Sequence, residues 1–396
     1  MTQEEIQKEA IKTWYLTKKG TIVLPTGVGK TYVGITIAGI QLQFSKIKSA
    51  LVIVPTTNLK QQWKNEFEKW GYSLKGVRIE CVQTARKIRD HYDLVIIDEI
   101  HTSLSKVNRG VFDIPRNQLV GFTATIPEDR ELLDTVCPVV YTREVKQVME
   151  DEIISKVKVF NIECSFNKTD KAKYKVFNSQ FNRAAMELGI LKKHFGLEEA
   201  VFDIAKQYSA SKLDFPIVKW SRQFWGAMTM RKAVCYNSES KIDLAVEIIN
   251  YFPSKKWILF NKSINIAEKL KNKLPNAVIY HSKQSTEDRE ESLRKFSDSS
   301  SNILIAVDAL NAGLNVPDAN AAICLSGVSK ELVGVQQLGR IGRKHGNKIG
   351  LFFNLYTKGT VEERWTKSRT KSLNPAWIKS VKQCAAYRSS KDIYSH

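Results

Sequence analysis

Residues 24 to 32 read LPTGVGKTY and follow directly on the apolar run TIVL at 21–24. An apolar run that passes into glycines and then into Lys30 and Thr31 is typical of a strand, a tight loop and a helix start. Gly27 and Gly29 permit positive φ values and a close backbone approach. Because the N–H groups of such a loop and the positive end of the helix point at one place, the stretch predicts a phosphate-binding loop.

The two residues that open the helix have separate expected roles. Lys30 is expected to reach the β- and γ-phosphates of a nucleotide, and the Thr31 hydroxyl is expected to hold Mg²⁺. The strict G-x-x-x-x-G-K-T form is not met, because position 24 is Leu24. The alternative is a tight helix N-terminus that binds nothing. The loop residues expected around the phosphates are Thr26, Gly27, Val28 and Gly29.

The run LVIIDEIH at 94–101 ends a predicted buried strand with two acids, Asp98 and Glu99. Ligands of α/β proteins bind at the carboxyl edge of the sheet, where both carboxylates are expected. Two adjacent carboxylates are costly to bury without a cation, so Mg²⁺ is the expected partner. We assign Asp98 to the metal, through water, and Glu99 to the proton of the attacking water. The alternative is a solvated strand end.

Short apolar runs alternate with polar, helix-like stretches in both halves of the chain, which is typical of parallel sheets covered on both faces. The fold class is therefore α/β. The expected strands of the first half are 21–24, 50–55, 77–82, 94–98 and 119–125. Those of the second half are 257–260, 277–281, 303–307, 321–325 and 350–356.

The segment between these series reads as mostly helical after VKVFNIEC and is rich in cations. We divide the chain into an α/β domain at 1–140, a basic helical insertion at 141–238, a second α/β domain at 239–360 and a basic tail at 361–396. Cations and aromatics alternate in KYKVFNSQFNR and KWSRQFWGAMTMRK, as they do on surfaces that stack nucleic-acid bases. For Phe224 and Trp225 we favour a place in the core of a helical bundle.

Composition points to a polyanionic partner. The chain has 396 residues, 61 Lys and Arg against 41 Asp and Glu, and a net charge of +20, which creates a field suited to nucleic acid. A solvated Lys-rich surface is the alternative. Six separated cysteines without a C-x-x-C pair indicate reduced thiols. Since the sequence shows neither a signal peptide nor a membrane span, we expect a soluble cytoplasmic protein, in a host cell if it is phage-encoded and in the nucleus if it is eukaryotic. We also expect a monomer.

Eight short motifs occur in this order: LPTGVGKT, VPTTNLKQQW, CVQTARK, DEIH, FTAT, ILFNKS, AVDALNAGLNVPDAN and QQLGRIGRK. They resemble motifs I, Ia, Ib, II, III, IV, V and VI of the superfamily 2 (DExH-type) helicases, over about residues 1 to 356. The resemblance is strongest to the DNA helicase and translocase branch around XPB, phage UvsW and restriction-enzyme motors. It implies two tandem RecA-like P-loop domains. Because the motifs begin almost at Met1, we expect no N-terminal recognition domain ahead of them.

The resemblance also assigns residues around the nucleotide. Gln7 stands where the family reads adenine, so the implied nucleotide is ATP; an exposed helix glutamine is the alternative. Arg340 and Arg343 resemble the arginines that stabilise the leaving phosphoryl group. Gly313 and Asn315 resemble residues that meet the nucleotide or its ribose. Residues that resemble those coupling hydrolysis to movement are His101, Thr123, Thr125 and Gln336.

Backbone contacts to nucleic acid are expected at the strand ends of both lobes. Polar side chains and amides there suit phosphates and carry no sequence readout. The alternative for each is turn capping or ordinary surface polarity. The residues are Thr56, Lys60, Gln83, Thr84, Asn261, Lys262, His281 and Ser282.

These observations lead to an expected activity. We expect an ATP- and Mg²⁺-dependent helicase or translocase that acts on DNA, single-stranded or branched, in replication, recombination or repair. The alternatives are an RNA helicase, an ATP-switched nucleic-acid clamp and the motor subunit of a restriction system. The resemblance implies 3′→5′ movement.

Overall fold

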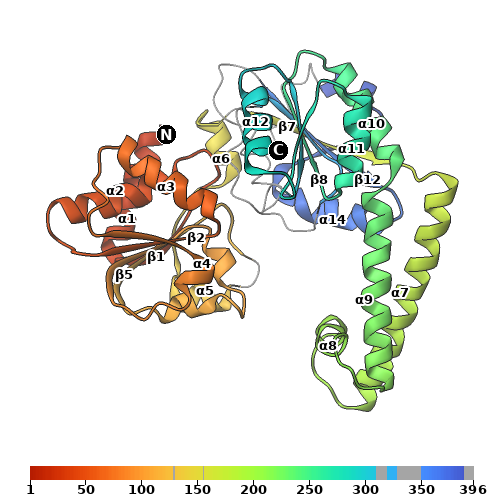
Figure 1. Ribbon diagram of the computed structural model, residues 1–396, viewed down its shortest axis with the longest axis horizontal. Coiled ribbons are helices and arrows are strands. Elements are labelled where there is room, and N and C mark those ends of the chain that lie inside the picture. Colours follow the sequence, from red (N-terminus) through yellow and green to blue (C-terminus); the bar gives the residue numbers. More distant parts are fainter. Residues whose placement is uncertain (128–129, 155, 309–318, 328–348, 388–396) are drawn as a thin grey trace.

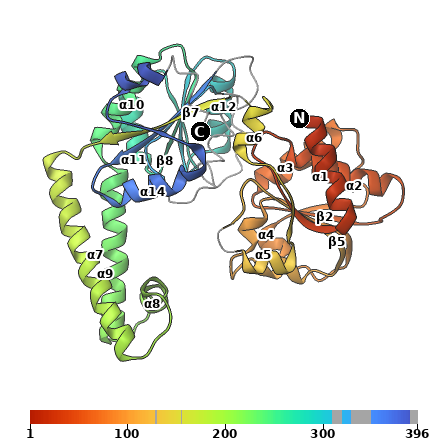
Figure 2. The ribbon, with the colours of Figure 1, turned by 180° about the vertical axis from the view of Figure 1, so that it is seen from behind.

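The computed structural model describes residues 1–127, 130–154, 156–308, 319–327 and 349–387. Figure 1 shows two α/β lobes side by side, with a pair of long helices that projects from the second lobe. The same arrangement is seen from behind in Figure 2. The predicted fold class, two tandem α/β units with a helical insertion, is confirmed.

The described strands of the first lobe form one parallel sheet in the order β3-β2-β4-β5-β1-β6. The strands are β1 Lys19–Val23, β2 Ala50–Val54, β3 Val77–Cys81, β4 Tyr92–Ile97, β5 Arg116–Thr123 and β6 Val139–Thr142. The α-helices are α1 Gln3–Thr17, α2 Lys30–Gln43, α3 Thr57–Lys69, α4 Val82–Ala85, α5 Glu131–Val136 and α6 Val145–Glu150. Two 3₁₀ turns, η1 Ile100–Ser103 and η2 Arg109–Asp113, follow β4.

Both faces of this sheet are buried, which explains the continuous apolar runs. In β2, Leu51 and Ile53 pack into the cluster on one face, whereas Val52 and Val54 pack on the other face with Trp63 of α3. Successive side chains of a strand point to opposite faces, so a strand covered on both sides needs apolar residues at every position.

The second lobe has a parallel sheet in the order β13-β7-β12-β11-β8-β10-β9. Its strands are β7 Val157–Cys164, β8 Trp257–Asn261, β9 Val278–Tyr280, β10 Ile303–Val307, β11 Ala321–Cys324, β12 Gly350–Thr357 and β13 Ala376–Ile378. The helices around it are α10 Glu239–Tyr251, α11 Ile264–Lys273, α12 Thr286–Ser297 and α14 Val361–Arg369. The 3₁₀ turns η4 Lys371–Leu373 and η5 Val381–Tyr387 accompany β13.

Strand β7 lies inside this second sheet, between β12 and β13. It precedes the long helices in sequence, so the helical insertion starts after a strand that already belongs to the second lobe. The segment after 360 contributes α14 and β13 to the same lobe, so its described part packs on the sheet.

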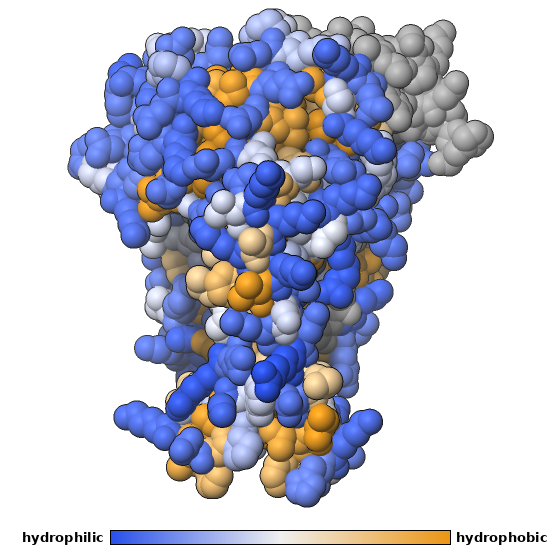
Figure 3. Space-filling view, turned by 90° about the vertical axis from the view of Figure 1, so that its right-hand side faces the viewer, coloured by the Kyte–Doolittle hydropathy of each residue, from blue (hydrophilic) through white to orange (hydrophobic). Residues whose placement is uncertain are grey.

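The insertion is a helical hairpin of α7 Lys168–His194 and α9 Pro216–Tyr236, with the short α8 Val201–Tyr208 at its free end. Phe224 is 4% exposed in the core between these helices, and Trp225 packs against that core, as predicted. Figure 3 shows apolar side chains gathered at the free end of the hairpin. The large exposed apolar residues between α7 and α9 are Phe195, Phe202, Leu213 and Phe215.

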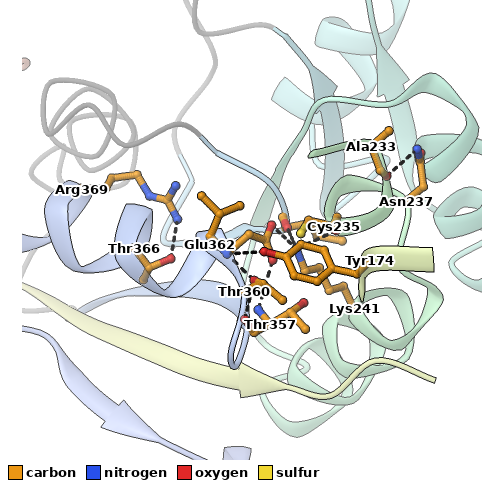
Figure 4. A network of polar contacts seen from close by, with 12 residues as sticks. Tyr174, Ala233, Cys235, Asn237, Lys241, Thr357, Thr360, Glu362, Thr366 and Arg369 are labelled. Carbon is orange, nitrogen blue, oxygen red and sulfur yellow. Dashed lines mark hydrogen bonds and ion pairs between the residues drawn. The ribbon is translucent and has the colours of Figure 1, made fainter. Parts of the chain in front are cut away.

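A buried ion pair holds the root of the hairpin to the second lobe (Figure 4). Lys241 Nζ donates to both carboxylate oxygens of Glu362, at 2.5 and 2.7 Å, and also to the carbonyls of Cys235 and Leu325. The two side chains are 1% and 4% exposed. Nearby, the Tyr174 hydroxyl accepts a hydrogen bond from the Val361 N–H. The network therefore joins α7, α9, α10, β11 and α14.

The two lobes share one continuous buried apolar cluster. It runs from the core of the first lobe through Ile153 and Ile154 to β7 and the second sheet. Ile154 also touches the phosphate loop, since a Cβ added at Gly27 would lie 3.3 Å from its Cγ2. Within the described residues no helix is long and apolar enough to cross a membrane.

Candidate functional site

The loop after β1 takes the conformation that its glycines allow. Gly27 and Gly29 both have φ of 96°, in the left-handed region that side chains disfavour, and α2 begins at Lys30. Lys30 Nζ donates to the Leu24 carbonyl at 3.1 Å, so the ammonium is held over the loop. The first turn of α2 thus points its free N–H groups into the same space as this cation.

Gln7 of α1 is tied to the loop. Its Nε2 donates to the Val28 carbonyl at 2.8 Å, and the side chain is 7% exposed. A Cβ added at Gly29 would lie 2.4 Å from the same nitrogen, so the close contact depends on glycine. Gln7 lines the cavity, and a carboxamide can both donate and accept hydrogen bonds.

Asp98 and Glu99 follow β4 at the carboxyl edge of the first sheet. Trp63 Nε1 of α3 donates to Asp98 Oδ2 at 2.9 Å, and the Glu99 N–H donates to Asp98 Oδ1 at 3.0 Å. Asp98 is therefore fixed in orientation. Glu99 has φ of 48° and ψ of 54°, and this left-handed residue ends the strand.

The electrostatics of this pair fit a cation. Burial, and then repulsion from Glu99, raises the pKa of Asp98 to about 6, although the Trp63 hydrogen bond and Lys30 act in the opposite direction. A carboxyl whose charge is this unfavourable is stabilised by a bound divalent ion. Hydroxyl and carboxylate oxygens, such as those of Thr31 and Asp98, are the donors that Mg²⁺ prefers.

A polar chain leads away from Glu99 along the strand ends. His101 Nδ1 lies 3.3 Å from Glu99 Oε2 and 3.3 Å from Thr123 Oγ1 at the end of β5. The Thr123 hydroxyl donates to the Thr125 carbonyl at 2.9 Å. The three residues predicted to couple hydrolysis to movement in the first lobe are thus brought together.

A cavity of about 720 Å³ collects most of the predicted nucleotide residues of the first lobe. A second cavity, of about 400 Å³, lies between α3 of the first lobe and α12 of the second. Gln62 and Glu66 line both cavities, so the first cavity lies next to the second, between the lobes. The predicted residues that line the first are Gln7, Thr26, Gly27, Gly29, Lys30, Thr31, Asp98 and Glu99.

The predicted nucleic-acid contacts of the first lobe lie at the carboxyl ends of β2 and β3. Thr56 caps α3, its hydroxyl accepting from Leu59 N–H, and Lys60 pairs with Glu80 at 3.0 Å. Gln83 and Thr84 are exposed on α4.

Their counterparts in the second lobe follow β8 and β9. Asn261 is 3% exposed and accepts the Ser263 N–H, and Lys262 pairs with Asp308. His281 Nδ1 accepts the Lys283 N–H, whereas Ser282 is exposed. Asn261 is therefore the least accessible of the eight to a polymer outside the sheet.

Five predicted residues lie outside the described residues, and the geometry above does not include them. They are Gly313, Asn315, Gln336, Arg340 and Arg343.

Several residues at the cavity were not assigned a role from the sequence. Trp63 carries the hydrogen bond to Asp98, while Tyr32, Lys69 and Trp70 line the cavity. Trp63 stands inside the VPTTNLKQQW motif, but no spacing rule indicates its partner. The contact exists because α3 packs across the start of α2, where a Cβ added at Gly34 would meet the Trp63 ring at 2.6 Å.

Two family patterns match separate parts of the chain. Residues 1–79 match the family described as type III restriction enzyme, res subunit. Residues 240–345 match the family described as helicase conserved C-terminal domain.

One relative and two solved structures are similar over at least 92% of this chain. A DNA 3′-5′ translocase XPB2 of Sulfurisphaera tokodaii is 29% identical over 388 residues, 92% of this chain and 84% of its own length. The helicase domain of Hef from Pyrococcus furiosus is similar in fold, with TM-score 0.55, 18% identity and coverage of 92% and 97% of the two chains. S. cerevisiae Dbp5 bound to RNA and ADP BeF3 has TM-score 0.61 at 14% identity, covering 98% and 93%.

Proposed function

We propose that this chain is a superfamily 2 helicase that hydrolyses ATP and couples the hydrolysis to movement along DNA. The observation that carries the proposal is one cavity where the phosphate loop and the Asp98–Glu99 pair converge beside the groove between the lobes. ATP hydrolysis in this cavity can change the arrangement of the two lobes relative to each other.

The loop and α2 would bind the triphosphate. Backbone N–H groups and Lys30 neutralise the β- and γ-phosphates, and Lys30 exchanges its bond to the Leu24 carbonyl for phosphate oxygen. Thr31 and Asp98 would hold Mg²⁺, which supplies positive charge to phosphate oxygens when it is bound. Trp63 keeps Asp98 oriented for this role.

Glu99 would accept the proton of the attacking water. It lies at the open edge of the sheet beside His101, and the contact at 3.3 Å gives the carboxylate a partner when the imidazole is protonated. Thr123 joins the same chain, so a change at Glu99 reaches the end of β5 through two contacts. We assign Arg340 and Arg343 to the leaving phosphoryl group on the resemblance of QQLGRIGRK.

DNA is the proposed polymer for two reasons. Similarity to a DNA 3′-5′ translocase extends over 92% of this chain, and the net charge of +20 attracts a polyanion. We extend the proposal to branched or forked DNA and to 3′→5′ movement by a monomer. An RNA helicase, an ATP-switched clamp and a restriction motor are the competing functions.

Nucleotide turnover with defined polymers tests the proposal. ATP hydrolysis is measured with single-stranded, duplex, forked and four-way DNA and with single-stranded RNA of equal length. We expect forked or four-way DNA to stimulate most and RNA least. Strand displacement by the wild type, lost in Glu99→Gln, supports a motor. Tight DNA binding without any displacement supports the clamp, and stimulation by RNA alone contradicts the proposal.

The phosphate loop is tested by Lys30→Ala. We expect turnover to be abolished while DNA affinity stays within about threefold, because the loop binds phosphate and not the polymer. Lys46→Ala, an exposed lysine of the same lobe, is the matched control and should keep wild-type turnover. Hydrolysis that persists in Lys30→Ala would refute the assignment of the loop.

The salt dependence of DNA binding tests whether the protein binds a polyanion through its phosphates. The logarithm of the DNA association constant should fall linearly with the logarithm of the salt concentration, by about 0.7–0.9 per neutralised phosphate. Fluorescence anisotropy of labelled DNA between low and physiological salt measures this slope. A flat response would exclude binding through the phosphates.

A further inference from the structure

The cavity is also lined by aromatic and cationic side chains that phosphate chemistry does not use. They are Tyr32 of α2 and Lys69 and Trp70 at the end of α3. Lys30, Thr31 and Asp98 line the same cavity. A triphosphate binds at the charged groups, so the aromatic walls remain for whatever is attached to it.

Tyr32 belongs to the aromatic walls and adjoins the charged groups in sequence. It directly follows Thr31 in the first turn of α2, and both residues line the same cavity. The Tyr32 and Trp70 ring centroids are 4.5 Å apart with an interplanar angle of 58°. The two rings form one continuous aromatic surface.

Trp70 is exposed and yet held in place. Its indole Nε1 donates to Glu66 Oε2 at 2.9 Å, and Lys69 Nζ lies 5.3 Å from the ring centroid. The residue is 45% exposed. The Lys69 side chain is 63% exposed, so a ligand that covers the indole can displace it at small cost.

We propose that Trp70 and Tyr32 form the purine-binding wall of this ATP site. The base of ATP lies against the aromatic surface, and the carboxamide of Gln7, fixed on the loop, meets a polar edge of the nucleotide. An aromatic ring stacks on the face of a base without reading its edge, so the wall adds affinity and Gln7 adds selectivity. The inference rests on the proposed use of ATP.

Two ligands distinguish binding at the aromatic wall from binding at the phosphate loop. The dissociation constants of ADP and of inorganic tripolyphosphate are measured by calorimetry for wild type, Trp70→Phe and Trp70→Leu. Trp70→Leu should weaken ADP binding about 5- to 100-fold, the range for loss of one base–aromatic stack. Tripolyphosphate affinity should stay within about twofold, because the leucine leaves the loop intact. Trp70→Phe should recover most of the ADP affinity.

Steady-state kinetics give an independent readout. The KM for ATP should rise in Trp70→Leu by a similar factor while kcat changes by less than about twofold, because base binding is the same before and during hydrolysis. A fall in kcat with unchanged KM would overturn the proposal.

Trp377 is a matched control in the second lobe. It is 41% exposed, its ring lies 5.1 Å from that of Tyr356, and Lys367 Nζ lies 5.9 Å from it. Trp377→Leu should bind both ligands as the wild type does. The proposal would be overturned if Trp70→Leu bound ADP with wild-type affinity, or if it lost affinity for ADP and tripolyphosphate equally. The same loss of ADP affinity in Trp377→Leu would also overturn it. Failure of the wild type to bind either ligand would instead refute the proposed ATP site.

Discussion

Replacing Lys241 by Met should destabilise the second lobe strongly. The variant leaves the Glu362 carboxylate buried, with the Thr357 N–H as a remaining donor at 3.1 Å, and removes all four hydrogen bonds of the ammonium. Breaking a buried ion pair from one side costs about 3–5 kcal/mol. For a lobe of this size each kcal/mol lowers the unfolding midpoint by about 2–4 °C, so we expect a decrease of about 6–20 °C.

Scanning calorimetry measures this decrease, and hydrogen exchange locates it. Exchange should accelerate in α10 and α14 and at the root of the hairpin, while the first lobe keeps wild-type protection. Lys269→Met is the control, because the ion pair of Lys269 with Glu239 is exposed at 43% and 61% and should contribute less than about 1 kcal/mol. The double variant Lys241→Met/Glu362→Leu should recover part of the loss. A midpoint for Lys241→Met within 2 °C of the wild type, or a decrease equal to that of Lys269→Met, would refute the reasoning.

Two further predictions concern the site and the hairpin. Gly29→Ala should cost about 1–3 kcal/mol and reduce ATP turnover, because φ is 96° and the new Cβ meets Gln7 Nε2 at 2.4 Å; Gly189→Ala, with open space in α7, should be neutral or stabilising. Thermal melts and ATPase rates of both variants check this, and equal effects would contradict it. Trp63→Phe should lower kcat about tenfold and raise the Mg²⁺ concentration that gives half-maximal turnover, because Asp98 loses an orienting donor. An unchanged Mg²⁺ dependence would exclude this role.

The strands that form the middle of each sheet could be predicted from the sequence because they are buried on both faces. ALVIV in β2 is entirely buried, and a run of this kind has few other places in a soluble fold. β6 is not among the predicted strands; it has four residues, VVYT, none of them fully buried, at a sheet edge. β13 has three residues, and so short a run carries no periodic signal.

The place of β7 depends on pairing that a local pattern does not contain. The run VKVFNIEC was recognised as strand-like, yet its neighbours β12 and β13 come much later in the chain. A strand's sequence indicates that it is buried and says little about which strand lies beside it. For this reason the insertion predicted from the sequence, residues 141–238, includes β7.

Some residues of the candidate site could likewise be predicted from the sequence, and others could not. Lys30 and Asp98 could be predicted because each follows a strand within a short motif, and parallel strands bring their carboxyl ends to one edge. Trp63, Tyr32 and Trp70 could not, because their contacts follow from the way α3 crosses α2. The burial of Lys241 likewise could not be predicted, because its partner Glu362 is 121 positions away.

The position of β7 has a consequence for synthesis on the ribosome. The strand emerges first among those of its sheet, but its two neighbours follow about 200 residues later. At roughly 5–20 residues per second, β7 waits about 10–40 s for β13 after it leaves the exit tunnel. The long helices between them contact mainly each other and can form during this interval. A nascent chain of this protein therefore carries an unpaired apolar strand for about half of its translation, and this is the segment that we expect a chaperone to bind.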